Sequence, residues 1–188
     1  LTIMNSKLII AVTGASGSLY ADKMLSEIIQ YSNYEVALIF SETGKKVWEY
    51  ELKKNVPVET DRIKIFDNQN YFAPPASGSV NYNYMVIVPC SMGTLGRIAH
   101  GTSNDLISRS ADVMLKERKK IILVPRELPY NLIHLKNMTT LTEAGAMIVP
   151  ASPSFYSHPK SIEQLVQTVT DRILKYIDIS KDSYEWGK

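Results

Sequence analysis

The sequence has little cysteine and little histidine. Cys90 is the one thiol in 188 residues, so no disulfide can form within the chain. A lone thiol favours a reducing compartment, and we expect a cytoplasmic protein. The three histidines, His100, His134 and His158, lack the spacing of metal ligands, so we expect no metal site.

The sequence also lacks a strong charge of one sign. Lys and Arg number 21 against 19 Asp and Glu, and the net charge of +2 is too small to indicate a nucleic-acid partner. Near the beginning, the apolar run Leu8–Val12 is too short for a secretory signal or a membrane span. We expect it to form a strand, and we expect no membrane association.

What the sequence does contain is a series of short, β-branched apolar runs bounded by turn residues. Runs without polar alternation predict strands buried on both faces, as in a parallel sheet covered by helices. Helical stretches lie between the runs, which predicts an α/β fold of three layers. The expected strands are Leu8–Val12, Val36–Phe40, Met85–Val88, Ile121–Val124 and Ala146–Val149. The expected helices are Leu19–Tyr31, Gly44–Lys53, Asp105–Arg118 and Ile133–Glu143.

A final helix carries the clearest amphipathic pattern. Its start has Ser161 and Gln164 at the spacing of a capping box. One apolar stripe at helical spacing follows, made of Ile162, Leu165, Val166, Val169, Ile173, Tyr176 and Ile177. We expect one domain over residues 1–179 and a loose, polar tail over 180–188.

Two long irregular connections interrupt the alternation, Asn68–Asn83 and Pro150–Pro159. Long loops in compact α/β domains usually serve a ligand. Their aromatic residues, Tyr71, Phe72 and Tyr156, are packing anchors or else the walls of a pocket for a flat ring.

Two loops of small residues follow expected strands. Thr13–Ser18 (TGASGS) opens a helix and could bind a phosphate through backbone N–H groups and the Ser16 hydroxyl; the alternative is a tight turn. Pro89–Thr94 (PCSMGT) follows another strand, and ligands bind beyond such strand ends in open α/β sheets. Together the loops indicate a nucleotide-like ligand. Cys90 lacks an evident base partner, which favours a small buried thiol over a nucleophile.

Several charged residues are candidates for binding anions or moving protons. Arg126 ends an expected buried strand and Arg172 borders the apolar stripe, and such arginines need anionic partners such as phosphate. Glu51 and Glu127 could transfer a proton beside a phosphate, although Glu51 could also lie on a solvated helix face.

The segments together resemble the flavin prenyltransferases, the UbiX-like family, from Lys7 to about Ile177. The resemblance rests on TGASGS at 13, APPASGS at 73, PCSMGTL at 89, SRSADVMLKERKKIILVPRE at 108, NLIHLKNM at 131 and GAMIVPASPSFYSHP at 145. It implies a flavodoxin-like (Rossmann-like) fold and a homo-oligomer, usually a dodecamer. It also implies transfer of a dimethylallyl group from dimethylallyl monophosphate to N5 and C6 of reduced FMN. The product, prenylated FMN, would serve a separate UbiD-like decarboxylase.

The resemblance also assigns residues. For FMN it implies Gly14, Ala15, Ser16, Ser41, Ser91, Met92, Gly93, Thr94 and Arg126, the last across a subunit boundary. Around the prenyl phosphate it implies Arg109, Lys116, Glu127, Tyr156 and Arg172, with Tyr71 beside the prenyl chain. As catalytic residues it implies Ser16, Glu51, Lys116 and Glu127.

Tyr71 stands where many members have Trp, which could alter the preference for the donor chain. Two alternatives to a prenyltransferase remain open. An FMN-dependent cysteine decarboxylase would carry an Asn-bearing PxSANT-like loop, whereas Pro75–Ser79 lacks that Asn. A non-catalytic flavin carrier would have no use for a second phosphate site.

Overall fold

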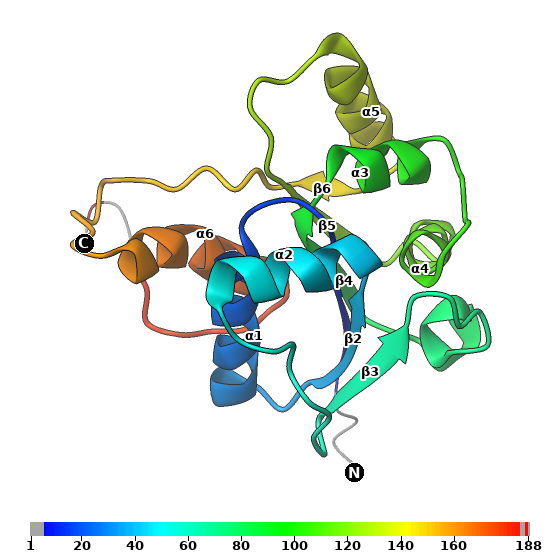
Figure 1. Cartoon of the computed structure of the whole chain (residues 1–188), viewed down its shortest axis with the longest axis horizontal. Coiled ribbons are helices and arrows are strands. Elements are labelled where there is room, and N and C mark those ends of the chain that lie inside the picture. Colours follow the sequence, from blue (N-terminus) through cyan, green and yellow to red (C-terminus); the bar gives the residue numbers. More distant parts are fainter. Residues whose placement is uncertain (1–5, 185–186, 188) are drawn as a thin grey trace.

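A single parallel sheet organises the chain. The computed structural model describes residues 6–184 and 187, and its six strands lie in the order β3-β2-β1-β4-β5-β6 (Figure 1). The fold is the expected flavodoxin-like (Rossmann-like) one, and its strand order is that of the Rossmann fold. The strands are β1 (Lys7–Val12), β2 (Glu35–Phe40), β3 (Ile63–Asp67), β4 (Tyr84–Cys90), β5 (Lys120–Pro125) and β6 (Met147–Ile148).

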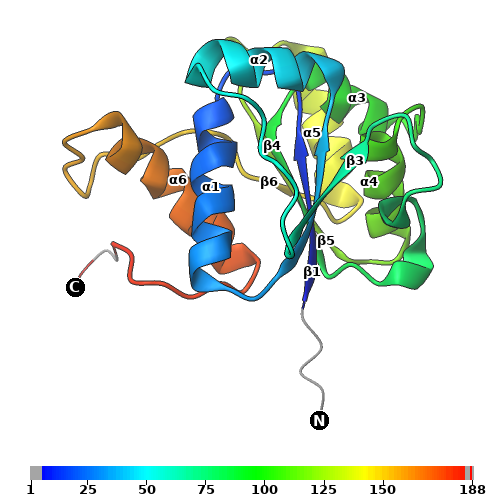
Figure 2. The same cartoon turned by 60° about the horizontal axis from the view of Figure 1, so that its bottom comes forward.

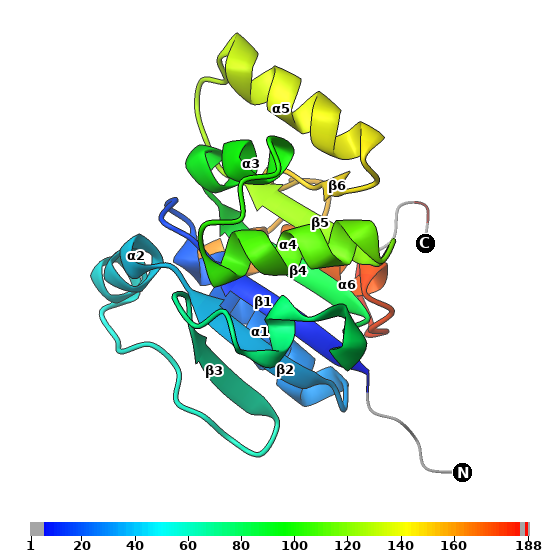
Figure 3. The same ribbon diagram turned by 90° about the vertical axis from the view of Figure 1, so that its right-hand side faces the viewer.

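Helices cover both faces of the sheet, which gives the three expected layers. One face packs against α1 and α6, and the other against α3, α4 and α5, while α2 lies across the carboxyl ends of the strands (Figure 2). The view in Figure 3 shows α3, α4 and α5 in front of the strands. The helices are α1 (Ser18–Tyr31), α2 (Glu42–Leu52), α3 (Met92–Ala99), α4 (Leu106–Lys116), α5 (Leu132–Glu143) and α6 (Ile162–Tyr176).

The first strand shows why the apolar runs lack alternation. Leu8, Ile10 and Val12 belong to the core beneath α1 and α6, whereas Ile9 and Ala11 belong to the core beneath α3 and α4. Side chains of a strand alternate between the two faces of its sheet. Because both faces are covered, every position of this strand is apolar.

Several elements differ from the sequence-based expectation, and helix α3 has no counterpart among the helix ranges expected above. Strand β3 was not predicted, because it lies at the sheet edge and mixes Lys64 with apolar residues. Strand β6 spans only two of the four expected residues. The connection 68–83 is not wholly irregular, since it holds two 3-10 turns, η1 (Pro74–Ala76) and η2 (Gly78–Val80).

The start of α6 forms only half of the expected capping box. Ser161 Oγ accepts a hydrogen bond from the N–H of Gln164 at 3.2 Å, as predicted. Gln164 Oε1 instead accepts from the N–H of Lys160 at 2.7 Å, one residue earlier than the box requires. The apolar stripe is buried at Val166, Val169, Ile173 and Ile177, whereas Ile162 is exposed.

The beginning of the polar tail is not loose. Ile179 is buried, and the Lys181 side chain is only 7% exposed. Its Nζ lies 2.5 Å from Glu27 Oε1 on α1 and 2.6 Å from Asp171 Oδ1 on α6. The tail is therefore fixed to two helices at Lys181, which residue composition alone does not reveal.

Candidate functional site

The carboxyl ends of β1, β2 and β4 bring three polar loops together. Thr13 Oγ1 donates to the carbonyl of Pro89 at 2.8 Å and accepts from the N–H of Ser91 at 2.8 Å. The N–H of Ser41 donates to the carbonyl of Val12 at 3.0 Å. The loops predicted to hold one nucleotide-like ligand are thus joined by direct hydrogen bonds.

The loop 13–18 is shaped by two of its glycines. A Cβ on Gly14 would lie 2.5 Å from Thr43 Cγ2, so only glycine lets α2 approach this closely. Gly17 has a φ of 117°, a backbone conformation that side chains disfavour. The loop is therefore a tight turn as well as a candidate binding loop.

Glu51 occupies the start of α1. Its carboxylate accepts from the N–H of Gly17 at 3.0 Å and from the N–H of Ser18 at 2.8 Å. Burial raises the pKa of the Glu51 carboxyl, but hydrogen bonds from Ser16, Gly17 and Ser18 outweigh burial and lower it. The solvated-face interpretation of Glu51 is wrong. An anion at the start of α1 would also have to displace this carboxylate, so the structure does not support a phosphate there.

The starts of α2 and α3 are better placed to bind an anion. Ser41 Oγ accepts from the N–H of Gly44, and Ser91 Oγ accepts from the N–H of Thr94, so each serine caps the third residue of its helix. The earlier N–H groups of a helix have no partner within it, and the helix dipole favours negative charge there. Met92 and Gly93 provide such N–H groups on α3.

Arg126 connects the end of β5 to the glycine-rich loop. Its Nε donates to the carbonyl of Ser16 at 3.1 Å. Arg126 is half-buried and lies at the carboxyl end of the sheet, as the three loops do. A cation and several N–H and O–H donors therefore surround one location.

Cys90 lies beside these loops in surroundings that disfavour reactivity. The side chain is fully buried, and desolvation raises the pKa of its thiol to about 12, despite the nearby Arg97. A thiolate is the nucleophilic form of cysteine, and it would be scarce near neutral pH. The structure therefore agrees with the small buried thiol.

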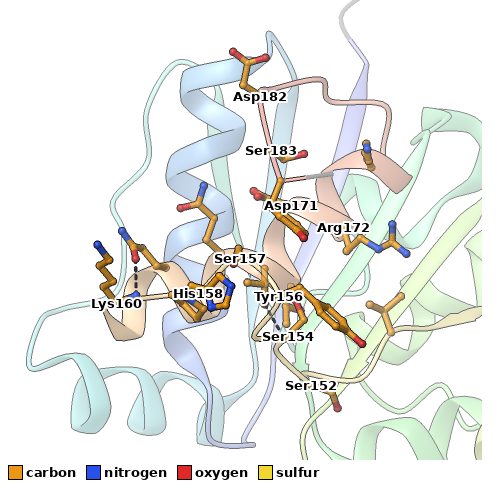
Figure 4. A pocket seen from close by; sticks show the side chains of 18 of the residues that line it. Ser152, Ser154, Tyr156, Ser157, His158, Lys160, Asp171, Arg172, Asp182 and Ser183 are labelled. Atoms are coloured by element: carbon orange, nitrogen blue, oxygen red, sulfur yellow. Dashed lines mark hydrogen bonds between the residues drawn. The ribbon is translucent and has the colours of Figure 1, made fainter. Parts of the chain in front are cut away.

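A separate cavity of about 940 Å³ opens beside α6 (Figure 4). Its walls are residues 149–160, one side of α6 and the tail residues 182–184. Tyr156 and Arg172 both line it, and Arg172 is exposed rather than half-buried. The N–H of Ala151 donates to the carbonyl of Pro125 at 3.0 Å, so the cavity wall starts beside Arg126.

The remaining residues of the expected prenyl-phosphate cluster lie elsewhere in the chain. Arg109 and Lys116 are on α4, which covers the opposite face of the sheet from α6 (Figure 2). Arg109 pairs with Asp112 at 2.8 Å, and Lys116 pairs with Glu117. One chain alone therefore does not bring these two cations to Tyr156 and Arg172.

Glu127 and Tyr71 also stay outside the cavity. Glu127 is exposed, and its Oε1 accepts from the N–H of Leu128 at 3.0 Å. Tyr71 is 42% exposed in the connection before η1.

Sequence reasoning missed Arg97, which supports the loop 89–94. Its Nη2 donates to Thr94 Oγ1 at 3.0 Å and lies 3.5 Å from Asp105 Oδ2. The three-residue spacing of Thr94 and Arg97 on a helix was the available signal. Arg97 links the loop to the start of α4.

Over residues 6–184 and 187, no helix is long and apolar enough to cross a membrane. In the same part of the chain, no group of three or more His, Cys, Asp or Glu side chains could hold a metal ion.

Comparison with known proteins identifies the family. The flavoprotein family model matches residues 2–174, so the chain belongs to the flavoproteins. Within that family it is one of the UbiX-like flavin prenyltransferases. It is 40% identical to the flavin prenyltransferase UbiX of Methanocaldococcus jannaschii, with 96% of this chain and 98% of the relative covered.

Two solved structures are similar to the chain in both fold and sequence. The structure of AnUbiX (PadA1) in complex with FMN and dimethylallyl pyrophosphate matches with a TM-score of 0.87 and 36% identity, covering 97% of this chain and 99% of that one. A dodecameric FMN-dependent UbiX-like decarboxylase from Escherichia coli O157:H7 matches with a TM-score of 0.89 and 34% identity, covering 97% and 100%. The resemblance seen in the sequence is confirmed.

Proposed function

We propose that this protein is a flavin prenyltransferase that moves a dimethylallyl group from dimethylallyl monophosphate to reduced FMN. One observation supports this most directly. The joined loops at the carboxyl ends of the strands and the cavity bearing Arg172 are two places suited to an anion, and they adjoin at Pro125 and Ala151. A flavin carrier would need only the first of them.

The residues at the carboxyl ends of the strands fit FMN. The N–H groups at the starts of α2 and α3 and the hydroxyls of Ser41 and Ser91 can hold a phosphate. Arg126 lies beside Ser16 and can contact the polar edge of the ring system. Reduced FMN supplies the nucleophilic N5 and C6 atoms that receive the prenyl group. The loop residues that we assign to it are Gly14, Ala15, Ser16, Ser41, Ser91, Met92, Gly93 and Thr94.

We propose that Tyr156 and Arg172 bind the phosphate of the prenyl donor. Charge on the phosphate grows as the allylic carbon–oxygen bond breaks, and a guanidinium and a phenol aimed at that charge lower the barrier. Both side chains line the same cavity, on residues 149–160 and on α6 (Figure 4).

We propose that Glu51 and Ser16 transfer the proton at N5 of the flavin. The lowered pKa of Glu51 keeps it ionised, which makes it an acceptor for a proton leaving the flavin. Glu127 would protonate the departing phosphate. Because Glu127 is exposed in one chain, this role depends on a neighbouring subunit.

An exposed apolar surface supports assembly of a homo-oligomer. Leu128, Leu132 and Ile133, at and before the start of α5, are 87%, 65% and 67% exposed. Exposed apolar residues gathered in this way mark a protein interface. A second copy would cover them, and Arg109 and Lys116 of neighbouring copies could then complete the donor site. We propose a dodecamer whose product serves a UbiD-like decarboxylase.

One assay tests this proposal. The protein is mixed anaerobically with reduced FMN and dimethylallyl monophosphate, and the released flavin is analysed by mass spectrometry. We expect flavin heavier by one five-carbon prenyl unit, together with free phosphate. Because of Tyr71, geranyl and isopentenyl phosphates are tested as well. Unchanged flavin with all three donors would refute the proposal, and carbon dioxide from a cysteinyl substrate would favour the decarboxylase.

A further inference from the structure

The tail that follows α6 forms part of the donor cavity. Asp182, Ser183 and Tyr184 line it, and Figure 4 shows Asp182 and Ser183 on the side of the cavity where Asp171 lies. The tail is held there by Lys181, whose side chain points away from solvent. The anchoring of the tail is thus linked to the shape of the cavity.

Lys181 lies within a buried group of charges. Its Nζ contacts Glu27 at 2.5 Å and Asp171 at 2.6 Å. Glu27 also pairs with Lys23 at 3.4 Å and accepts from Thr170 Oγ1 at 3.0 Å. Two carboxylates therefore meet two ammonium groups, and the group as a whole is neutral.

The charge of the Asp171 carboxylate is balanced by Lys181 to a greater extent than the charge of the Glu27 carboxylate is. Among the described residues, Asp171 Oδ1 has no hydrogen bond of normal geometry, so the ammonium 2.6 Å away is what balances its charge. Burial raises the pKa of the Asp171 carboxyl, and the contact with Lys181 opposes that rise. Removing one member of a buried ion pair leaves the other uncompensated.

Asp171 and Arg172 are consecutive residues of α6 and line the same cavity. An unbalanced carboxylate lining this cavity would repel a phosphate bound within it. With Lys181 in place, the charge of Asp171 is balanced and the cavity is more favourable for an anion at Arg172.

We propose that Lys181 is a positioning residue for the prenyl donor. It balances the charge of Asp171, so that no unpaired carboxylate opposes a phosphate in the cavity that Arg172 lines. This inference rests on the proposed function, because it takes the ligand at Arg172 to be the donor phosphate. It adds a residue outside the cavity to the determinants of donor affinity.

The test compares variants of the FMN-loaded protein. Lys181→Met should weaken binding of dimethylallyl monophosphate by about tenfold, measured by calorimetry, and raise its KM similarly, while FMN affinity and kcat stay close to wild type. Lys181→Arg keeps the charge and should restore donor binding. Lys54→Met is a control for the loss of a lysine–aspartate pair, because it removes a more exposed lysine 2.6 Å from an aspartate, Asp22, away from the cavity.

A second variant separates charge from folding. In Lys181→Met with Asp171→Asn no charge is left unbalanced, and donor affinity should return to within about threefold of wild type. If Lys181→Met does not fold, this double variant and Lys181→Arg still carry the test, and a donor affinity tenfold weaker in both would overturn the inference. Equal donor affinity in wild type and a folded Lys181→Met would also overturn it. Donor binding without any prenyl transfer would instead overturn the proposed function alone.

Discussion

Replacing Glu51 by Gln should destabilise the protein, because the Glu51 carboxylate binds the start of α1. It accepts two N–H groups there, from Gly17 and Ser18. A carboxylate at a helix start with charge-assisted hydrogen bonds contributes about 1–2 kcal/mol once partial solvent exposure is allowed for. We expect Glu51→Gln to lower the free energy of unfolding by that amount at pH 7.

The same contacts set the pH dependence. The pKa of the Glu51 carboxyl is lowered in the folded protein, so its stabilising effect is complete above the pKa of the unfolded chain. The effect is lost as the pH falls through the folded pKa. The difference between wild type and Glu51→Gln should therefore shrink when the solution is acidified below about pH 4.

Urea unfolding at fixed protein concentration measures this difference. With a urea dependence of about 2 kcal/mol per molar, the midpoint should fall by about 0.5–1 M at pH 7. Glu49→Gln is the control, since Glu49 is exposed on the same helix. An unchanged midpoint for Glu51→Gln, or a difference that persists in acid, would show that the carboxylate does not hold the helix start.

Three further predictions concern binding, assembly and reactivity. Arg172→Met should raise the KM for dimethylallyl monophosphate about 10–150-fold, the equivalent of about 1.5–3 kcal/mol, while calorimetry finds FMN affinity unchanged; a normal KM would remove Arg172 from the donor site. Leu132→Asp should reduce the assembly measured by light scattering and lower prenyl transfer with it, and an active monomer would contradict the composite site. Cys90 should react with iodoacetamide only slowly at pH 8, because its thiol pKa is about 12, and rapid labelling of the folded protein would contradict its burial.

The sequence predicted the centre of the sheet well but its edges less well. Strands β1, β2, β4 and β5 are buried on both faces, and their apolar runs carry that information directly. Strand β3 is half-exposed, and polar residues such as Lys64 hide it among loops. Periodicity reports burial, so it identifies best the elements that are most enclosed.

The candidate site was predictable at its loops and not in its long-range contacts. The small residues around Ser16 and Ser91 follow strand ends, and parallel strands bring those ends together. The contact between Glu51 and Gly17 joins residues 34 positions apart and depends on how α2 crosses the sheet. The anchoring of Lys181 to Glu27 depends likewise on the packing of α1 against α6.

The order of strands has a consequence for synthesis of the chain on the ribosome. Strand β1 is the first to emerge, yet it lies inside the sheet, with β2 on one side and β4 on the other. Its second edge pairs with β4, beginning with Leu8 opposite Tyr84. This edge stays open until β4 has been made. An open apolar strand edge is prone to pair with other chains. Nascent chains that end before residue 84 should therefore expose an open apolar strand edge and be prone to aggregation.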